Sequence, residues 1–218
     1  MAERREQTLV ALAWPDGAPQ PEPLAGWSAA GWRVEPVLAD QSALDRAGSK
    51  GRTPPPFQTL LWHDLAPGDP AAVLVADGLP DLAARWTALR VVDHPAWDDT
   101  TERGVVPQVK QVSFLKAQTG LTQEAFRRHF REHVAVARVH HPAICRYEQH
   151  DVLDRGGDAG LDTQGVSELW FADEDDLAAR YFAGPDSVPI VRADNREYID
   201  FSGTLSLLVR PDDRRGPA

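Results

Sequence analysis

The segment Val109–Leu153 constrains the fold of this chain most, because it reads as a strand, a helix and a second strand in succession. Thr122 can cap the helix N-terminus with its hydroxyl, and Leu121 and Phe126 have the spacing of a hydrophobic staple. At about 100° per residue, the series Phe-Phe-His-Ala that begins at Phe126 falls on one narrow stripe of this helix. The sequence therefore predicts a helix whose buried face carries a histidine, His133, at its centre.

Composition excludes several classes of protein. The chain of 218 residues holds 33 acidic and 23 basic side chains, a formal charge of −10, which argues against a nucleic-acid or anionic-membrane surface. No apolar run approaches the roughly 20 residues that span a bilayer, and the charged start MAERREQ has no apolar segment behind it, so we expect no signal peptide. The single cysteine, Cys145, excludes an intrachain disulfide. We therefore expect a cytoplasmic protein whose partner is a small molecule, not a nucleic acid or a membrane.

Apolar runs and turn signals predict the order of the elements. Two polar stretches, Ser42–Pro56 and Asp98–Pro107, read as a loop and as the boundary between two halves, and Asp186–Asn195 reads as irregular or as a short helix. The expected strands are Thr8–Trp14, Trp32–Leu38, Phe57–Leu65, Ala71–Ala76, Val109–Lys116, Ala143–Leu153, Val166–Phe171 and Thr204–Arg210, and the expected helices are Leu24–Ala30, Pro80–Leu89, Thr122–Val139 and Asp173–Phe182.

A repeated pentapeptide suggests that the two halves are related. DLAAR begins at Asp81 and again at Asp176, each time after an apolar strand candidate and an Ala-Asp pair, which favours a duplicated unit over a chance match. Each half then reads β-α-β-β-α-β, the ferredoxin-like unit, whose sheet has helices on one face only. The sequence thus predicts an α+β fold in which two ferredoxin-like halves, residues 1–104 (degenerate) and 105–218, pack sheet to sheet as an intrachain α+β barrel.

Four segments of the second half together resemble the EthD family of dimeric α+β barrel proteins: FLKAQTGLTQEAFRRHFRE, HPAICRYEQHDVL, SELWF and YIDFSGTLSLLV. The resemblance implies a pocket between sheet and helices, and it leaves room for a homodimer. The first helix of the family usually ends in a histidine followed two residues later by proline, and the aligned positions here hold Val134 and Val136. His133 lies one residue earlier, so either it takes the same role or the family's histidine is lost.

Three polar side chains are candidates for catalysis. His133 suits acid–base work, because a histidine with a pKa near 6.5 takes and returns a proton at cytoplasmic pH; the alternative is a buried histidine satisfied by a hydrogen bond. Glu168 shares a strand face with Val166 and Trp170, which favours a carboxyl of raised pKa or a partner for an arginine. Tyr147 can donate a hydrogen bond to a substrate carbonyl, or it can fill a barrel core.

The remaining expectations concern pocket walls, metals and cofactors. Phe126, Phe130 and Trp170, with other tryptophans, are expected to wall a pocket for an aromatic ligand, although such rings more often fill a core. His129 and His133 have a spacing that can share a metal, but no carboxylate completes a HExxH pattern. No glycine-rich phosphate loop precedes a helix. We therefore expect no metal and no cofactor.

The resemblance implies functions of two kinds, since relatives include cofactor-free decarboxylases and dehydratases of polyketide aromatics and accessory proteins in pollutant breakdown. The first hypothesis is a cofactor-independent lyase or isomerase that decarboxylates, dehydrates or cyclises a small aromatic or polyketide-like carbonyl compound. In it His133 moves the proton, while Tyr147 and Glu168 orient the substrate. The alternative is a non-catalytic small-ligand-binding accessory protein, and a weaker alternative is a cofactor-free oxygenase.

Overall fold

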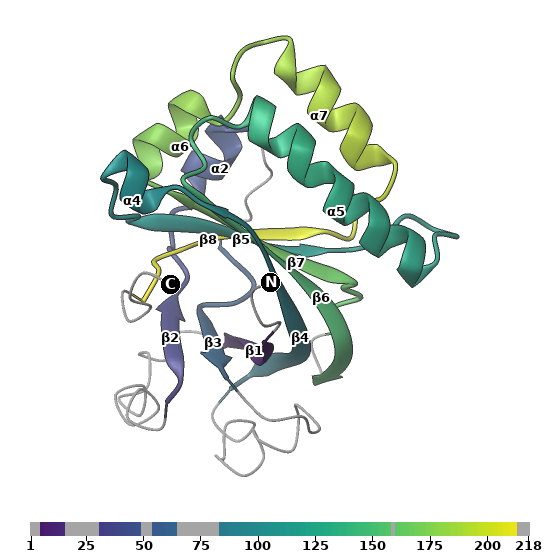
Figure 1. Ribbon diagram of the computed structural model, residues 1–218. Helices are drawn as coiled ribbons and strands as arrows, with labels where there is room; N and C mark the ends of the chain where they lie inside the picture. The colour runs from purple at the N-terminus through teal and green to yellow at the C-terminus, as the bar shows by residue number, and fades with distance from the viewer. Residues whose placement is uncertain (1–4, 16–30, 49–53, 65–82, 158–159, 213–218) are drawn as a thin grey trace.

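The computed structural model describes residues 5–15, 31–48, 54–64, 83–157 and 160–212, and Figure 1 shows their arrangement. In these residues eight strands form one sheet in the order β2-β3-β1-β4-β6-β7-β5-β8, and every neighbouring pair is antiparallel. The first four strands and the last four have the same internal order, that of a ferredoxin-like unit. The strands are β1 (Glu6–Ala13), β2 (Arg33–Pro36), β3 (Thr59–His63), β4 (Arg85–Asp98), β5 (Val109–Leu115), β6 (Arg146–Gly157), β7 (Gly165–Phe171) and β8 (Leu205–Val209).

The sheet closes on itself within the chain. On one side β4, 14 residues long, pairs with both β1 and β6. On the other side Val37, just after β2, bridges to Val209 of β8, and the amide of Arg210 donates to the carbonyl of Pro36 at 3.0 Å. The predicted intrachain α+β barrel is therefore confirmed. The two sets of strands meet through hydrogen-bonded edges, so that their inner faces enclose one common core.

Helices cover the outer face of the last four strands (Figure 1). These are α5 (Gln123–His140), α6 (Glu174–Arg180) and α7 (Ser187–Arg196), while α2 (Ser42–Arg46) and α4 (Thr100–Arg103) are single turns. Thr122 caps α5 as predicted, its hydroxyl accepting from the amide of Ala125 at 3.1 Å. The buried residues of α5 are those of the predicted stripe, Phe126, Phe130, His133 and Ala137. None of the helices in the described residues is long and apolar enough to cross a membrane.

Alternation along the strands separates two cores, because successive side chains point to opposite faces. On β7, Val166 belongs to the core inside the barrel and Leu169 to the core under the helices. Glu168 has the parity of Val166 and contacts other side chains of the interior. Every second residue of β5, β7 and β8 therefore faces the helices, and a cavity lies on this outer face.

The two halves share one strand order, but the two DLAAR segments do not occupy equivalent positions in them. The second DLAAR lies in α6, whereas in the first copy Arg85 begins β4, so the expected helix Pro80–Leu89 is a strand over its last five residues. Leucine, alanine and arginine favour a helix, but pairing with strands on both sides overrides that local preference.

Smaller corrections concern the loops. The expected loop Ser42–Pro56 contains α2, and the boundary stretch Asp98–Pro107 contains α4. The expected helix Leu24–Ala30 and strand Ala71–Ala76 lie outside the described residues. The other predicted strands and helices agree with the observed ones to within a few residues at their ends.

Candidate active site

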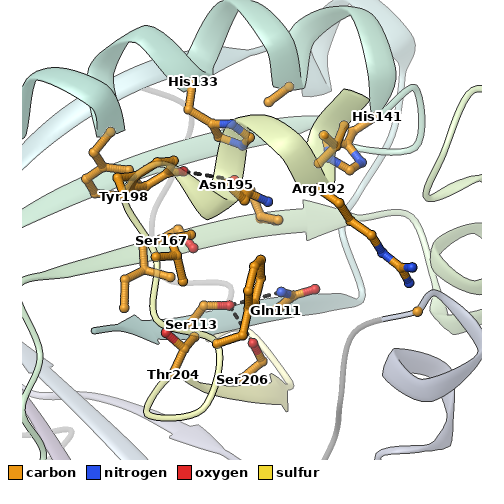
Figure 2. A pocket seen from close by; sticks show the side chains of 18 of the residues that line it. Gln111, Ser113, His133, His141, Ser167, Arg192, Asn195, Tyr198, Thr204 and Ser206 are labelled. Carbon is orange, nitrogen blue, oxygen red and sulfur yellow. Dashed lines mark hydrogen bonds between the residues drawn. The ribbon is translucent and has the colours of Figure 1, made fainter. Parts of the chain in front are cut away.

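A cavity of about 560 Å³ lies between the sheet and the helices α5 and α7 (Figure 2). Its volume falls in the range of small-molecule sites. Its floor is built from β5, β7 and β8, and its roof from the two helices and the segment that follows α7. The polar side chains among its lining residues include Gln111, Ser113, Ser167 and Ser206 on the sheet and His133, His141, Arg192, Asn195, Tyr198 and Thr204 around it.

A row of serines makes the middle of the floor. Ser206, Ser113 and Ser167 are cross-strand neighbours on β8, β5 and β7. Gln111, on the same face of β5, donates from Nε2 to the hydroxyl of Ser113 at 2.9 Å, and the hydroxyls of Ser113 and Ser206 lie 2.9 Å apart. Since three small side chains stand side by side beneath α5, the space above them stays open and its floor is polar.

His133 hangs from α5 into the roof of this cavity. Its Nδ1 lies 2.6 Å from Oδ2 of Asp194 on α7, a residue 61 positions away in the chain, and the histidine is 8% exposed. Among the described residues, Nε2 has no hydrogen-bond partner. A carboxylate at Nδ1 holds the proton on that nitrogen and leaves Nε2 as the basic one. The pair can therefore accept a proton from a molecule in the cavity.

Two buried tyrosines add hydroxyl groups to the lining. Burial raises the pKa of both Tyr147 and Tyr198 above the ordinary value, so both keep their protons at neutral pH. Tyr198 donates to Oδ1 of Asn195 at 3.1 Å, and its ring centroid lies 5.9 Å from that of His133. The hydroxyl of Tyr147 accepts from Nε2 of Gln149 at 2.9 Å and so keeps its own proton for another acceptor. His133 and Tyr147, both expected to act on a substrate, line the same cavity.

Glu168 lies on the opposite face of the sheet, inside the barrel. Nζ of Lys110 lies 2.5 Å from Oε2 of Glu168 and 2.6 Å from Oε2 of Glu35, and Lys110 and Glu168 are both fully buried. Burial by itself would raise the pKa of Glu168, but Lys110 and His150 beside it hold that pKa well below its usual range. Glu168 is thus an ion-pair partner within the barrel, and the sheet separates it from the cavity.

His150 belongs to the same interior cluster. Its Nδ1 lies 2.7 Å from Oδ1 of Asp93, and its Nε2 lies 3.3 Å from Oε1 of Glu168. Burial works to lower its pKa, but the hydrogen bonds to Asp93 and Glu168 outweigh burial and raise the pKa to about 9. Ligand atoms of Glu148, His150 and Glu168 lie within 4.8 Å of one another, as the ligands of a metal do. However, His150 is a cation and Lys110 already neutralises Glu168, so this donor set suits an ion cluster better than a metal.

The aromatic residues expected to wall a pocket are dispersed. Phe130 lines the cavity; Phe126 packs behind it, with ring centroids 5.6 Å apart. Trp170 lines a separate hollow at the end of the barrel, where the guanidinium of Arg146 lies 4.7 Å from its ring centroid. Within the described residues no tryptophan lines the cavity, so tyrosines and phenylalanines replace the expected tryptophan walls. His129 is outside the cavity, with Nδ1 3.8 Å from Glu132.

Sequence reasoning missed several lining residues. Asp194 lies in a stretch that lacked a clear helical pattern, and no local signal connects it to His133. The serine row depends on strand register, which a single sequence does not give. His141 also lines the cavity and donates from Nδ1 to the carbonyl of Tyr181 at 2.6 Å; its burial lowers its pKa to about 4, so it is neutral at pH 7.

Comparisons with known proteins agree with this architecture. Residues 118–202 match the EthD domain family. A solved structure described as an "anthrone oxidase-like protein" superposes with a TM-score of 0.54 at 8% identity, over 97% of this chain and 92% of that chain. At this identity the likeness shows the fold alone.

Two further structures give lower scores. A "putative monooxygenase from Lactobacillus acidophilus NCFM" has a TM-score of 0.47 at 6% identity, over 95% of this chain and 93% of that chain. A "Putative Chlorite dismutase TA0507" has a TM-score of 0.46 at 11% identity, over 97% of this chain and 96% of that chain. No curated protein sequence matches the chain.

Proposed function

We propose that the chain processes a small molecule in the cavity beneath α5 and that His133 moves a proton on it; the match of residues 118–202 to the EthD domain family supports a small-molecule role. The reaction class is that of a cofactor-independent lyase or isomerase acting on a small carbonyl compound. One observation carries the proposal: Nδ1 of His133 is held at 2.6 Å by Asp194, while Nε2 has no partner among the described residues. Such a dyad is a general base in its resting state.

The lining residues divide the chemistry among them. Nε2 of His133 takes a proton from the carbon next to a carbonyl group, and the electron pair of the broken C–H bond moves toward the carbonyl oxygen. Asp194 stabilises the imidazolium that forms. The free hydroxyl proton of Tyr147 is the donor for the oxygen on which charge develops. Return of the proton to a different atom gives isomerisation, and loss of a β-hydroxyl group as water gives dehydration.

The test is an exchange experiment. A panel of small β-dicarbonyl and phenolic ketones is incubated with the protein in D₂O, and mass spectrometry records deuterium uptake or loss of water or CO₂. We expect His133→Gln to remain folded and to lower the rate by about a hundredfold or more, the usual scale of general acid–base catalysis. The matched control His129→Gln changes a histidine of the same helix outside the cavity and should keep the rate. A folded His133→Gln protein with full activity would contradict the proposal.

A second candidate shares the first step. A cofactor-free oxygenase also begins by removing a proton, which makes an electron-rich anion that O₂ can oxidise; the neighbour with a TM-score of 0.54 is described as anthrone oxidase-like. Oxygen uptake in step with loss of substrate would favour this reaction. Ligand binding without exchange or oxygen uptake would favour the non-catalytic accessory role.

We also propose a cytoplasmic setting and one boundary within the chain. Cys145 is buried, and burial raises the pKa of its thiol to about 11, so it is a poor nucleophile that fits a reducing compartment. The two ferredoxin-like halves are best divided between residues 104 and 105, after α4. Since the barrel closes within one chain, a homodimer would have to form through its outer surface.

A further inference from the structure

The hydrogen-bonding groups of the cavity floor are incompletely paired. Oε1 of Gln111 is buried and has no hydrogen-bond partner, and the residue is 5% exposed. Its amide nitrogen is used by Ser113, so the amide is fixed with its oxygen unpaired (Figure 2). An unpaired buried acceptor costs roughly 1–3 kcal/mol. The floor therefore has a place for a group that donates a hydrogen bond.

The floor also holds spare donors. Ser113 and Ser206 have two hydroxyl protons between them, and only one hydrogen bond joins the two hydroxyls. One of these protons therefore has no acceptor among the described residues. The hydroxyl of Ser167, their neighbour in the row, forms no hydrogen bond with the described residues. The floor thus offers one acceptor and at least two donors on the same face.

A hydroxyl group of a ligand can pair with both the acceptor and the donors of the floor, because it donates one hydrogen bond and accepts up to two. We propose that the serine row and Gln111 form a subsite for a hydroxyl group of the ligand, so that the molecule processed beneath His133 is a hydroxylated compound. This inference rests on the proposed function for its cavity and adds the substrate class. The apolar part of the ligand then lies against Phe130 and Leu169, which line the same cavity.

The position of the subsite gives it a role in specificity. It is built on three paired strands, whose backbone positions are fixed by the sheet, whereas His133 approaches from the roof. A ligand anchored by its hydroxyl on the floor presents its opposite edge toward the helices. A compound without the hydroxyl leaves Oε1 of Gln111 buried and unpaired, and sites built to hydrogen-bond a substrate reject such analogues strongly.

The test is a binding measurement that needs no turnover. Naphthol and its hydroxyl-free parent, naphthalene, are titrated into the full chain, and the dissociation constants are obtained by calorimetry. We expect naphthol to bind at least about tenfold more tightly, the effect of satisfying one buried polar group. In Gln111→Met, which keeps the length of the side chain and removes the whole amide, both the unpaired oxygen and the donor to Ser113, this preference should fall to about twofold or less, with naphthalene binding unchanged. Ser167→Ala should reduce the preference by a smaller factor.

The matched control is Gln108→Met, the same change at an exposed position outside the cavity, which should keep the full preference. Equal affinities for the two compounds, no measurable binding of either, or a preference that survives in Gln111→Met would each overturn the subsite. Because neither probe reacts, these outcomes are independent of the exchange experiment. A failure of the subsite therefore leaves the role of His133 to be judged by its own test.

Discussion

Replacing Lys110 by methionine is the sharpest test of how the barrel interior is held together. Lys110→Met keeps most of the side-chain volume between the rings of Trp62 and Trp170, whose centroids lie 5.3 and 5.1 Å from Nζ. It removes the ammonium group that lies 2.6 Å from Glu35 and 2.5 Å from Glu168. The variant therefore creates a charge defect with little change in packing.

The size of the effect follows from burial. Glu168 is fully buried, and loss of one partner from a buried ion pair costs about 3–5 kcal/mol. His150 remains 3.3 Å from Oε1 of Glu168 as a second partner, so we expect the lower end of this range. That is a large part of the roughly 5–15 kcal/mol by which domains are usually stable. If the excess negative charge left by removal of the ammonium group is the cause, Lys110→Met combined with Glu168→Met should recover at least half of the loss.

Urea unfolding followed by tryptophan fluorescence measures these free energies of unfolding. The control is Lys116→Met, because Lys116 is a partly exposed lysine with its nitrogen 3.5 Å from Asp200. Exposed pairs contribute about 0–1 kcal/mol, so the control should stay within that range. A loss below about 1 kcal/mol for Lys110→Met, or no recovery in the double variant, would refute the view that the buried charges of Lys110 and Glu168 stabilise the fold only together.

Two further predictions concern His150 and Gly165. The pKa of His150 is raised from 6.5 to about 9, so its charge stabilises the fold fully below pH 6.5, and this contribution of up to about 3 kcal/mol is lost as the pH rises through 9. Urea midpoints measured at pH 7 and pH 10 should therefore fall less in Asp93→Asn than in the unchanged protein. An equal fall in both proteins would contradict this explanation. A Cβ on Gly165 would lie 2.9 Å from Phe126 and 3.0 Å from Phe130, so Gly165→Ala should destabilise the fold by about 1–3 kcal/mol in thermal melts. Gly184→Ala is the neutral control, because a Cβ on Gly184 would have no atom within 4 Å.

Local periodicity explains why the environment of His133 was predictable and its partner was not. A stripe repeating at 3.6 residues places His133 on the buried face of its helix without knowledge of the fold. Asp194 meets it only because α7 packs beside α5, 61 residues later in the chain. The same limit applies to Glu168. Alternation shows that Glu168 and Ser167 point to opposite faces of the sheet, but only closure of the barrel decides which of the two faces the helices.

Long-range pairing also explains the error at β4. The start of this strand carries helix-favouring residues, and Pro95 lies within its second half, where a proline argues against a strand. Among the described residues β4 pairs with β1 only as far as Val92, so Pro95 has no described strand paired on that side and lies next to a shift in the register with β6. Proline is tolerated at such positions. A single sequence does not show how far each neighbouring strand extends.

Closure of the barrel through Val37 and Val209 makes assembly of the core a unimolecular event. A barrel of this kind built from two separate chains would lose its core on dilution, because its stability would include an association constant. Here the two sets of strands are covalently connected, so the thermal midpoint of the barrel should not depend on protein concentration. The connection also means that each set occurs once per barrel. One set can therefore carry a ligand cavity while the other drifts in sequence, without a symmetry mate that must change with it.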